Sequence, residues 1–255
     1  MKEKILFVYD SMMIGGTTTA LLSLMNTIDR DKYDISLILY TNSGPAFNEI
    51  PSFVNLIKPA IKNSKILSYR KRKIIKTMFN GSVLLALKAW IKYKHTPKGK
   101  LRQILTHYGM AAQVSLSRVV DEKFDYAIGF MEGWANEYVA SSKMNAKKKF
   151  VWIHPQYKSC FLIPEIDRKI FKKVDGIALI SEDCMTQFLE YFGDFEKKVR
   201  IIPNIISANV IKRKAQQDDI IIRKTDINFC TVSRCDIQVK GLDRLLKCFY
   251  DLVFE

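Results

Sequence analysis

The sequence lacks acidic residues over one long internal stretch. Between Ile50 and Val120 there are 15 lysines and arginines but no aspartate or glutamate. The rest of the chain carries 26 basic and 26 acidic residues, so the formal net charge of +15 arises in this stretch alone. A charge excess confined to one segment indicates a surface that faces something anionic, or at least tolerates it.

Other absences narrow the class of protein. No cysteine precedes Cys160, and the five cysteines include no Cys-x-x-Cys pair, which indicates reduced thiols in a cytosolic protein rather than a disulfide framework. No apolar run is long enough to cross a bilayer, and the run after Met1 is too short for a signal peptide. The apolar fraction of 48% and the charged fraction of 26% are those of a soluble globular protein.

Short apolar strands alternate with helical patterns along most of the chain, which is typical of a parallel, doubly wound α/β sheet. Strands are expected at residues 4–9, 33–40, 53–57, 125–130, 147–153, 176–181 and 199–204. Helices are expected at 101–120, 135–141 and 163–174, and after Gly16 and Ser181. We expect Ser181 to cap its helix. The predicted domains are 1–204, a linker at 205–218, and a second domain beginning at 219–255.

The first strand leads into a loop that contains Gly15 and Gly16, and a helix follows. This is the first unit of a nucleotide-binding type of α/β domain, although it has neither the Gly-x-Gly-x-x-Gly fingerprint nor a Walker lysine. A glycine pair taken alone more often marks a tight turn.

Two further strand ends carry polar residues. The strand at 125–130 leads into Glu132 and Gly133, and the strand at 147–153 ends at His154. Parallel sheets place ligand groups at the carboxyl ends of their strands, so His154 is a candidate site residue, although most lone histidines are structural. Glu132, taken alone, fits a surface carboxylate or a partner for the dipole of the next helix.

Near the end of the chain, an apolar run at 227–232 is expected to form a buried strand, and Gly241 opens an apolar-periodic helix. A loop between a strand and a helix amino terminus is where α/β folds bind phosphates, because free backbone N–H groups and the helix dipole point there. Arg234 and Lys240 bring two cations into this loop. Taken alone, they fit a solvated basic loop.

The arrangement resembles glycosyltransferase family four, whose members are retaining enzymes of the GT-B fold. That family ends a strand in Gly-Arg, places Lys-Gly six residues after the arginine, and continues into a leucine-rich helix. Arg234 and Lys240 have this spacing, with Ser233 in place of the glycine. The family also has a Gly-Gly loop after its first strand and a histidine in a Trp-x-His setting, as at Trp152 and His154.

The resemblance implies an α/β fold with a Rossmann-like parallel sheet domain of GT-B type, which binds the acceptor, and a truncated second Rossmann-like domain for the nucleotide sugar. The implied activity is retaining transfer of a hexose-type sugar from a nucleotide-diphosphate donor to a glycan or lipid-linked acceptor in bacterial cell-surface polysaccharide biosynthesis. The nucleotide sugar is a substrate, and the resemblance implies no cofactor and no metal ion. The implied site residues are catalytic His154, donor-phosphate-binding Arg234, Lys240, Gly15 and Gly16, and acceptor-side Glu132 and Gly133.

The acidic motif Glu-x7-Glu, which holds the sugar and ribose in that family, has no counterpart before Glu255. We therefore expect this chain alone to transfer no sugar and to bind nucleotide sugars weakly. The alternative is a non-catalytic α/β binding protein that docks on a membrane or on a partner chain. The missing motif favours this alternative, whereas Arg234, Lys240 and His154 oppose it.

The acid-free segment, centred on residues 58–102, allows three interpretations. It could supply amphipathic helices that cover the sheet with solvated lysines, a patch that lies on anionic lipid, or a nucleic-acid surface. The complete absence of acidic residues ranks the membrane surface first and the covering helices second. Nucleic acid ranks last, because no nucleic-acid-reading motif accompanies the charge. We expect a cytoplasmic protein that binds no nucleic acid, with a peripheral position on the inner face of the membrane left open.

Overall fold

The computed structural model describes residues 2–61, 91, 101–159, 163–216, 229–233 and 240–254. The chain divides into two compact units, Met1–Lys212 and Arg213–Glu255. Within the acid-free segment, the helix expected at 101–120 is present as α4 (Leu101–Leu116), whereas residues 62–90 and 92–100 lie outside the described residues. Within the described ranges, no helix is long and apolar enough to span a membrane.

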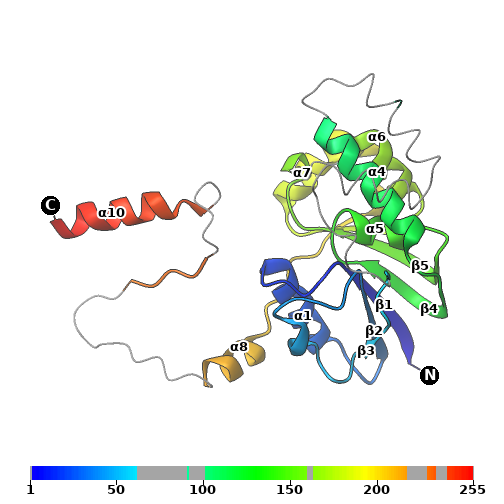
Figure 1. The fold of residues 1–255 in the computed structure, drawn as a ribbon, viewed down its shortest axis with the longest axis horizontal. Coiled ribbons are helices and arrows are strands. Elements are labelled where there is room, and N and C mark those ends of the chain that lie inside the picture. The colour runs from blue at the N-terminus through cyan, green and yellow to red at the C-terminus, as the bar shows by residue number, and fades with distance from the viewer. Residues whose placement is uncertain are drawn as a thin grey trace. The chain divides into compact units, whose positions relative to one another are not determined.

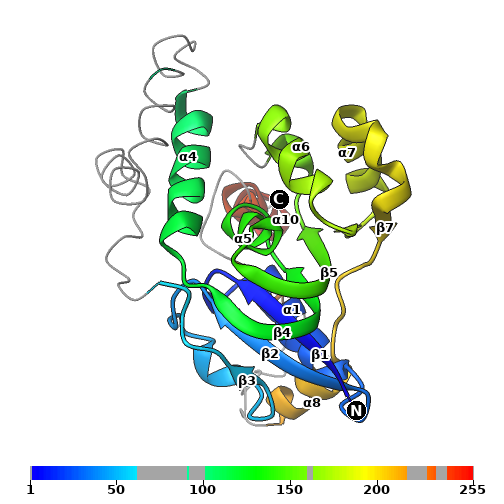
Figure 2. The same cartoon turned by 90° about the vertical axis from the view of Figure 1, so that its right-hand side faces the viewer.

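The first unit is built on a parallel sheet (Figures 1 and 2). Within the described ranges it has seven strands in the order β3-β2-β1-β4-β5-β6-β7. Their bounds are β1 (Glu3–Tyr9), β2 (Tyr33–Leu39), β3 (Asn55–Leu56), β4 (Val120–Gly129), β5 (Met144–Ile153), β6 (Gly176–Leu179) and β7 (Val199–Ile201). This is a Rossmann-like arrangement, and the predicted α/β class with a parallel sheet is confirmed. The strand order reverses between β1 and β4, where such sheets bind their ligands.

One face of the sheet packs on α1 (Gly16–Thr27). Alternate residues of β1 and β2, such as Phe7 and Leu37, share a buried cluster with Leu21 and Met25 of this helix. Successive strand residues point to opposite faces, so burying both faces requires the continuous apolar runs seen in the sequence.

The opposite face packs on α4 (Leu101–Leu116) and α5 (Trp134–Ala140), and further along on α6 (Pro164–Lys172) and α7 (Glu182–Phe192) (Figure 2). Val8 of β1 lies in one buried cluster with Tyr138 of α5, and Val151 of β5 lies in another with Phe188 of α7. The predicted cap of α7 is confirmed, because the Ser181 hydroxyl accepts a hydrogen bond from the Cys184 amide at 3.2 Å.

Several predicted element bounds differ from the structure. The strand expected at 53–57 pairs only through Asn55 and Leu56. Strands β4 and β5 begin earlier than expected, at Val120 and Met144. Their first halves are charged because they lie near solvent, where Lys147 pairs with Asp125 at 2.6 Å. Helix α8 (Ala208–Ala215) lies within the segment expected to be a linker.

The second unit corrects one prediction and confirms another. The expected helix after Gly241 is present as α10 (Leu242–Phe254). The expected buried strand at 227–232 is wrong where the structure describes it, because residues 229–233 form no strand, and Phe229 and Val232 are 66% and 94% exposed. A strand is stabilised by pairing with neighbouring strands, and the described part of this unit contains none.

Gly44 holds the loop after β2 against the loop after β1. Its φ is +114°, and a Cβ atom there would lie 2.2 Å from the Met12 carbonyl oxygen. We expect Gly44→Ala to lower the free energy of unfolding by about 1–3 kcal/mol, through backbone strain and the displaced Met12 carbonyl. Urea unfolding followed by circular dichroism measures this.

Gly193→Ala is the matched control for this substitution. Gly193 has a φ of −56° and nothing within 4 Å of an added Cβ, so alanine is expected to leave the stability unchanged or raise it by up to about 1 kcal/mol. Equal destabilisation by the two changes would contradict the close approach of Gly44 to Met12.

Candidate functional site

Three polar side chains meet the carboxyl ends of three neighbouring strands. Asp10 follows β1, Glu132 follows β4 by three residues, and His154 follows β5 directly. Because β1, β4 and β5 are adjacent in the sheet, the topology brings these residues to the point where the strand order reverses. Two of them, Glu132 and His154, were predicted as site residues, whereas Asp10 was not.

His154 is fixed at the end of β5 by its aromatic neighbours and by hydrogen bonds. The residue is 8% exposed. Its ring stacks on Trp152 with an interplanar angle of 6° and lies 4.9 Å from the Phe130 ring, centroid to centroid. The His154 backbone N–H points to the Glu132 carboxylate at 3.5 Å, and its carbonyl oxygen accepts a bond from the Cys184 thiol at 4.0 Å.

The protonation of the His154 ring follows from the hydrogen bond at Nε2. Nε2 lies 3.1 Å from the Phe130 carbonyl oxygen, which can only accept, so Nε2 carries the proton. Burial lowers the pKa of His154 to about 4, which the Phe130 bond and the nearby Asn204 side chain counteract only in part. The ring is therefore neutral at pH 7. Nδ1 presents a lone pair, and this buried atom has no hydrogen-bond partner among the described residues.

Glu132 and Gly133 form the turn from β4 into α5. Burial raises the pKa of Glu132, while its bond from the His154 amide acts in the opposite direction. Gly133 has a φ of +89°, a conformation that favours glycine, and an added Cβ would lie 2.9 Å from the Met110 sulfur. The conformation and packing of Gly133 thus account for the glycine without a ligand.

Asp10 is the site residue that the sequence analysis missed. Its carboxylate oxygen Oδ1 is fully buried and has no hydrogen-bond partner among the described residues. Burial, followed by the charge of Glu132, raises the pKa of Asp10 to about 7. The signal that could have revealed it is its position, since an aspartate directly after a buried parallel strand lies where such sheets bind ligands.

Gly15 and Gly16 lie at the amino terminus of α1. Gly15 is extended, with a φ of 171°, and an added Cβ on either glycine would meet nothing within 4 Å. No side chain caps this helix, and its first turn carries no acidic residue, so its first amides are open to a ligand. The Tyr9 and Thr18 hydroxyls, 3.0 Å apart, join this turn to the end of β1.

The predicted phosphate-binding pair belongs to the second unit. Arg234 lies outside the described residues, and Lys240 is exposed just before α10. Gly241 has a φ of +61°, which explains the glycine at the start of this helix. The structure therefore brings together Glu132 and His154 with the newly found Asp10, while the role of Arg234 and Lys240 stays a prediction.

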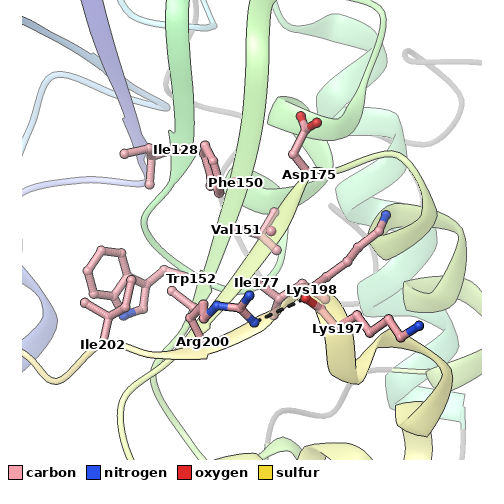
Figure 3. Close-up of a pocket in the computed structure, with 12 residues that line it drawn as sticks. Ile128, Phe150, Val151, Trp152, Asp175, Ile177, Lys197, Lys198, Arg200 and Ile202 are labelled. Atoms are coloured by element: carbon pink, nitrogen blue, oxygen red, sulfur yellow. Dashed lines mark hydrogen bonds between the residues drawn. The ribbon is translucent and has the colours of Figure 1, made fainter.

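A cavity of about 260 Å³ lies beside β5, β6 and β7, and Phe150 and Trp152 are among its lining residues (Figure 3). Its charged residues are largely paired. The Arg200 guanidinium donates to the Lys197 carbonyl oxygen at 3.2 Å (Figure 3). Asp175 accepts from the Lys148 ammonium at 2.9 Å. The unpaired, buried groups of Asp10 and His154 make the strand ends the better candidate site.

Among the described residues, no group of three histidine, cysteine, aspartate or glutamate side chains is arranged to hold a metal ion. No family model matches the chain, and no curated protein matches it. Its function is therefore inferred from the strand-end residues and from the motifs of the sequence.

Proposed function

We propose that this protein is a glycosyltransferase that transfers a sugar, with retention, from a nucleotide-diphosphate donor to a glycan or lipid-linked acceptor. The observation that carries the proposal is His154, a buried, neutral imidazole with an unpartnered Nδ1 at the carboxyl end of β5. A parallel sheet of this kind binds ligands at the carboxyl ends of its strands, where His154 lies. The Trp-x-His setting of His154 supports a sugar as the ligand.

In this proposal His154 orients the transferred sugar. Its Nδ1 lone pair accepts a hydrogen bond from a sugar hydroxyl, and the bond from Nε2 to the Phe130 carbonyl keeps the ring in the tautomer that can do so. The Trp152 and Phe130 rings hold the imidazole in one orientation, so little freedom is lost when the sugar binds.

The remaining residues neutralise the charge of the donor or bind the acceptor. Arg234 and Lys240 neutralise the leaving diphosphate, whose charge develops in the transition state. Glu132 accepts a hydrogen bond from the acceptor. Neither a cofactor nor a metal ion takes part in this proposal.

The acid-free segment at residues 58–102 extends the proposal to the location of the reaction. Fifteen basic residues without a single acid between Ile50 and Val120 suit contact with anionic lipid. We place the protein in the cytoplasm, peripheral to the inner face of the membrane, where a lipid-linked acceptor of surface polysaccharide synthesis is presented.

Binding of nucleotide-diphosphate sugars to the full chain tests this proposal. In ¹⁵N-histidine-labelled protein, a panel of such sugars is expected to shift the Nδ1 resonance of His154, one of only three histidines. His154→Ala is expected to weaken binding about tenfold, the equivalent of one hydrogen bond of about 1.4 kcal/mol. Calorimetry measures this change.

His107→Ala is the matched control, because it removes a second buried imidazole from α4, outside the strand-end site. It should leave sugar binding unchanged. If His154→Ala binds as well as the unmodified chain, His154 is a core residue. If no nucleotide sugar binds at all, the alternative gains support, namely a non-catalytic α/β protein that docks on a membrane or on a partner chain.

A further inference from the structure

Asp10 offers a buried polar atom to a ligand. The residue is half-buried, its Oδ1 is fully buried, and no described residue hydrogen-bonds that atom. Buried polar atoms are almost always paired, because an unpaired one costs free energy. The backbone around it is well fixed, since the Asp10 carbonyl accepts a bond from the Thr41 amide at 3.2 Å. The side chain is thus held at the strand end without a partner of its own.

A second carboxyl group lies close enough to affect Asp10. Glu132 lies in the turn between the neighbouring strand β4 and α5. Its charge contributes to the raised pKa of Asp10. Two carboxylates in a poorly solvated place repel each other, so the ionised pair is costly and one of them tends to keep a proton. Any ligand bound at this point meets an acidic pair.

The amino terminus of α1 follows Asp10 by six residues, and the two carboxyl groups favour a different ligand from the one that this helix terminus favours. The open amino terminus of α1 by itself favours an anion such as a phosphate. A phosphate monoester is mainly a dianion at neutral pH, so its oxygens act chiefly as acceptors and are repelled by an ionised carboxylate. A hydroxyl group both donates and accepts, so it satisfies Asp10 whether that carboxyl is ionised or protonated.

We infer that Asp10 determines the acceptor specificity of this site: it hydrogen-bonds a neutral hydroxyl of the acceptor sugar and, together with Glu132, excludes acceptors that carry a phosphate at that position. The inference rests on the proposed function, because it names the class of acceptor for the same site. It also implies that the donor diphosphate lies away from Asp10. The carboxylates then exclude phosphorylated acceptors without weakening the binding of the donor.

The test compares neutral and phosphorylated sugars on the full chain. The probes are methyl glycosides of glucose, galactose and mannose and the corresponding hexose 6-phosphates, with binding followed by ligand-observed NMR. The unmodified chain is expected to prefer at least one neutral glycoside over its phosphate by about tenfold, and Asp10→Asn is expected to abolish that preference. Asp10→Glu, which keeps the charge, should retain it.

Asp34→Asn is the matched control, since it makes the same change at an exposed residue. Asp34 lies at the amino end of β2, whereas the site lies at the carboxyl ends of the strands. It should leave the preference intact. Equal binding of both sugar classes by the unmodified chain, binding of neither, or an unchanged preference in Asp10→Asn would overturn the inference. If nucleotide sugars fail to bind but Asp10→Asn still abolishes the preference, the proposed transferase function is wrong and the specificity role of Asp10 stands.

Discussion

Phe188→Ala is expected to lower the free energy of unfolding by about 3–5 kcal/mol. The Phe188 side chain is 0% exposed, and its ring lies 5.2 Å from that of Phe171 and 4.7 Å from that of Phe192, centroid to centroid. Truncation removes these contacts and leaves a cavity between α6 and α7 that the aromatic neighbours can fill only in part. Urea unfolding at pH 7, followed by circular dichroism, gives the difference.

Glu190→Ala on the same helix provides the comparison. The Glu190 carboxylate pairs with the Lys158 ammonium at 2.8 Å, but both side chains are about half exposed, at 51% and 52%. An exposed ion pair contributes little to stability, so this variant should stay close to the unmodified protein. A loss below about 1 kcal/mol for Phe188→Ala would contradict the aromatic packing of α6 and α7.

Glu137→Gln is expected to remove much of the pH dependence of stability in the neutral range. Glu137 lies on α5, and burial, with a contribution from Asp167 and opposed by Lys173, raises its pKa to about 8. A pKa that is raised on folding means that stability is complete below the unfolded value and falls as pH rises towards 8. Between pH 6.5 and 8 the loss is about 2 kcal/mol. A glutamine cannot ionise, so the variant should lack this loss.

Between pH 6.5 and 8, the effect of Glu137 on stability can be told apart from the effects of other titratable groups. The pKa of Asp167 is raised only to about 6, and that of His154 is lowered to about 4, so both contribute mainly below pH 6.5, with opposite signs. Asp10, with a pKa of about 7, contributes equally to the unmodified protein and the variant. The urea midpoint, measured at pH 6.5, 7.25 and 8, should therefore fall more steeply with pH in the unmodified protein than in Glu137→Gln. Parallel pH profiles for the two proteins would contradict the raised pKa of Glu137.

The local pattern of the sequence determined the elements of the first unit. A continuous apolar run predicted β1, because a strand covered on both faces has few places for polar residues. The alternation of Ile35, Leu37 and Leu39 predicted β2. The hydroxyl of Ser181 predicted the start of α7, since a helix cap depends on neighbours within one turn of the chain. The position of His154 at a strand end could be read in the same way. Each of these features depends on residues close together in the chain.

Only the tertiary structure decided which strand ends meet. The apolar pattern indicates which residues are buried but not which strands pair, so nothing in the sequence placed β1 between β2 and β4. That pairing brings Asp10 within reach of the charge of Glu132 and shifts its pKa, an effect of burial and of charges distant in the chain. The same reason explains the wrong prediction at 227–232. An apolar run becomes a buried strand only where neighbouring strands cover it, and none lies beside residues 229–233 in the described part of the second unit.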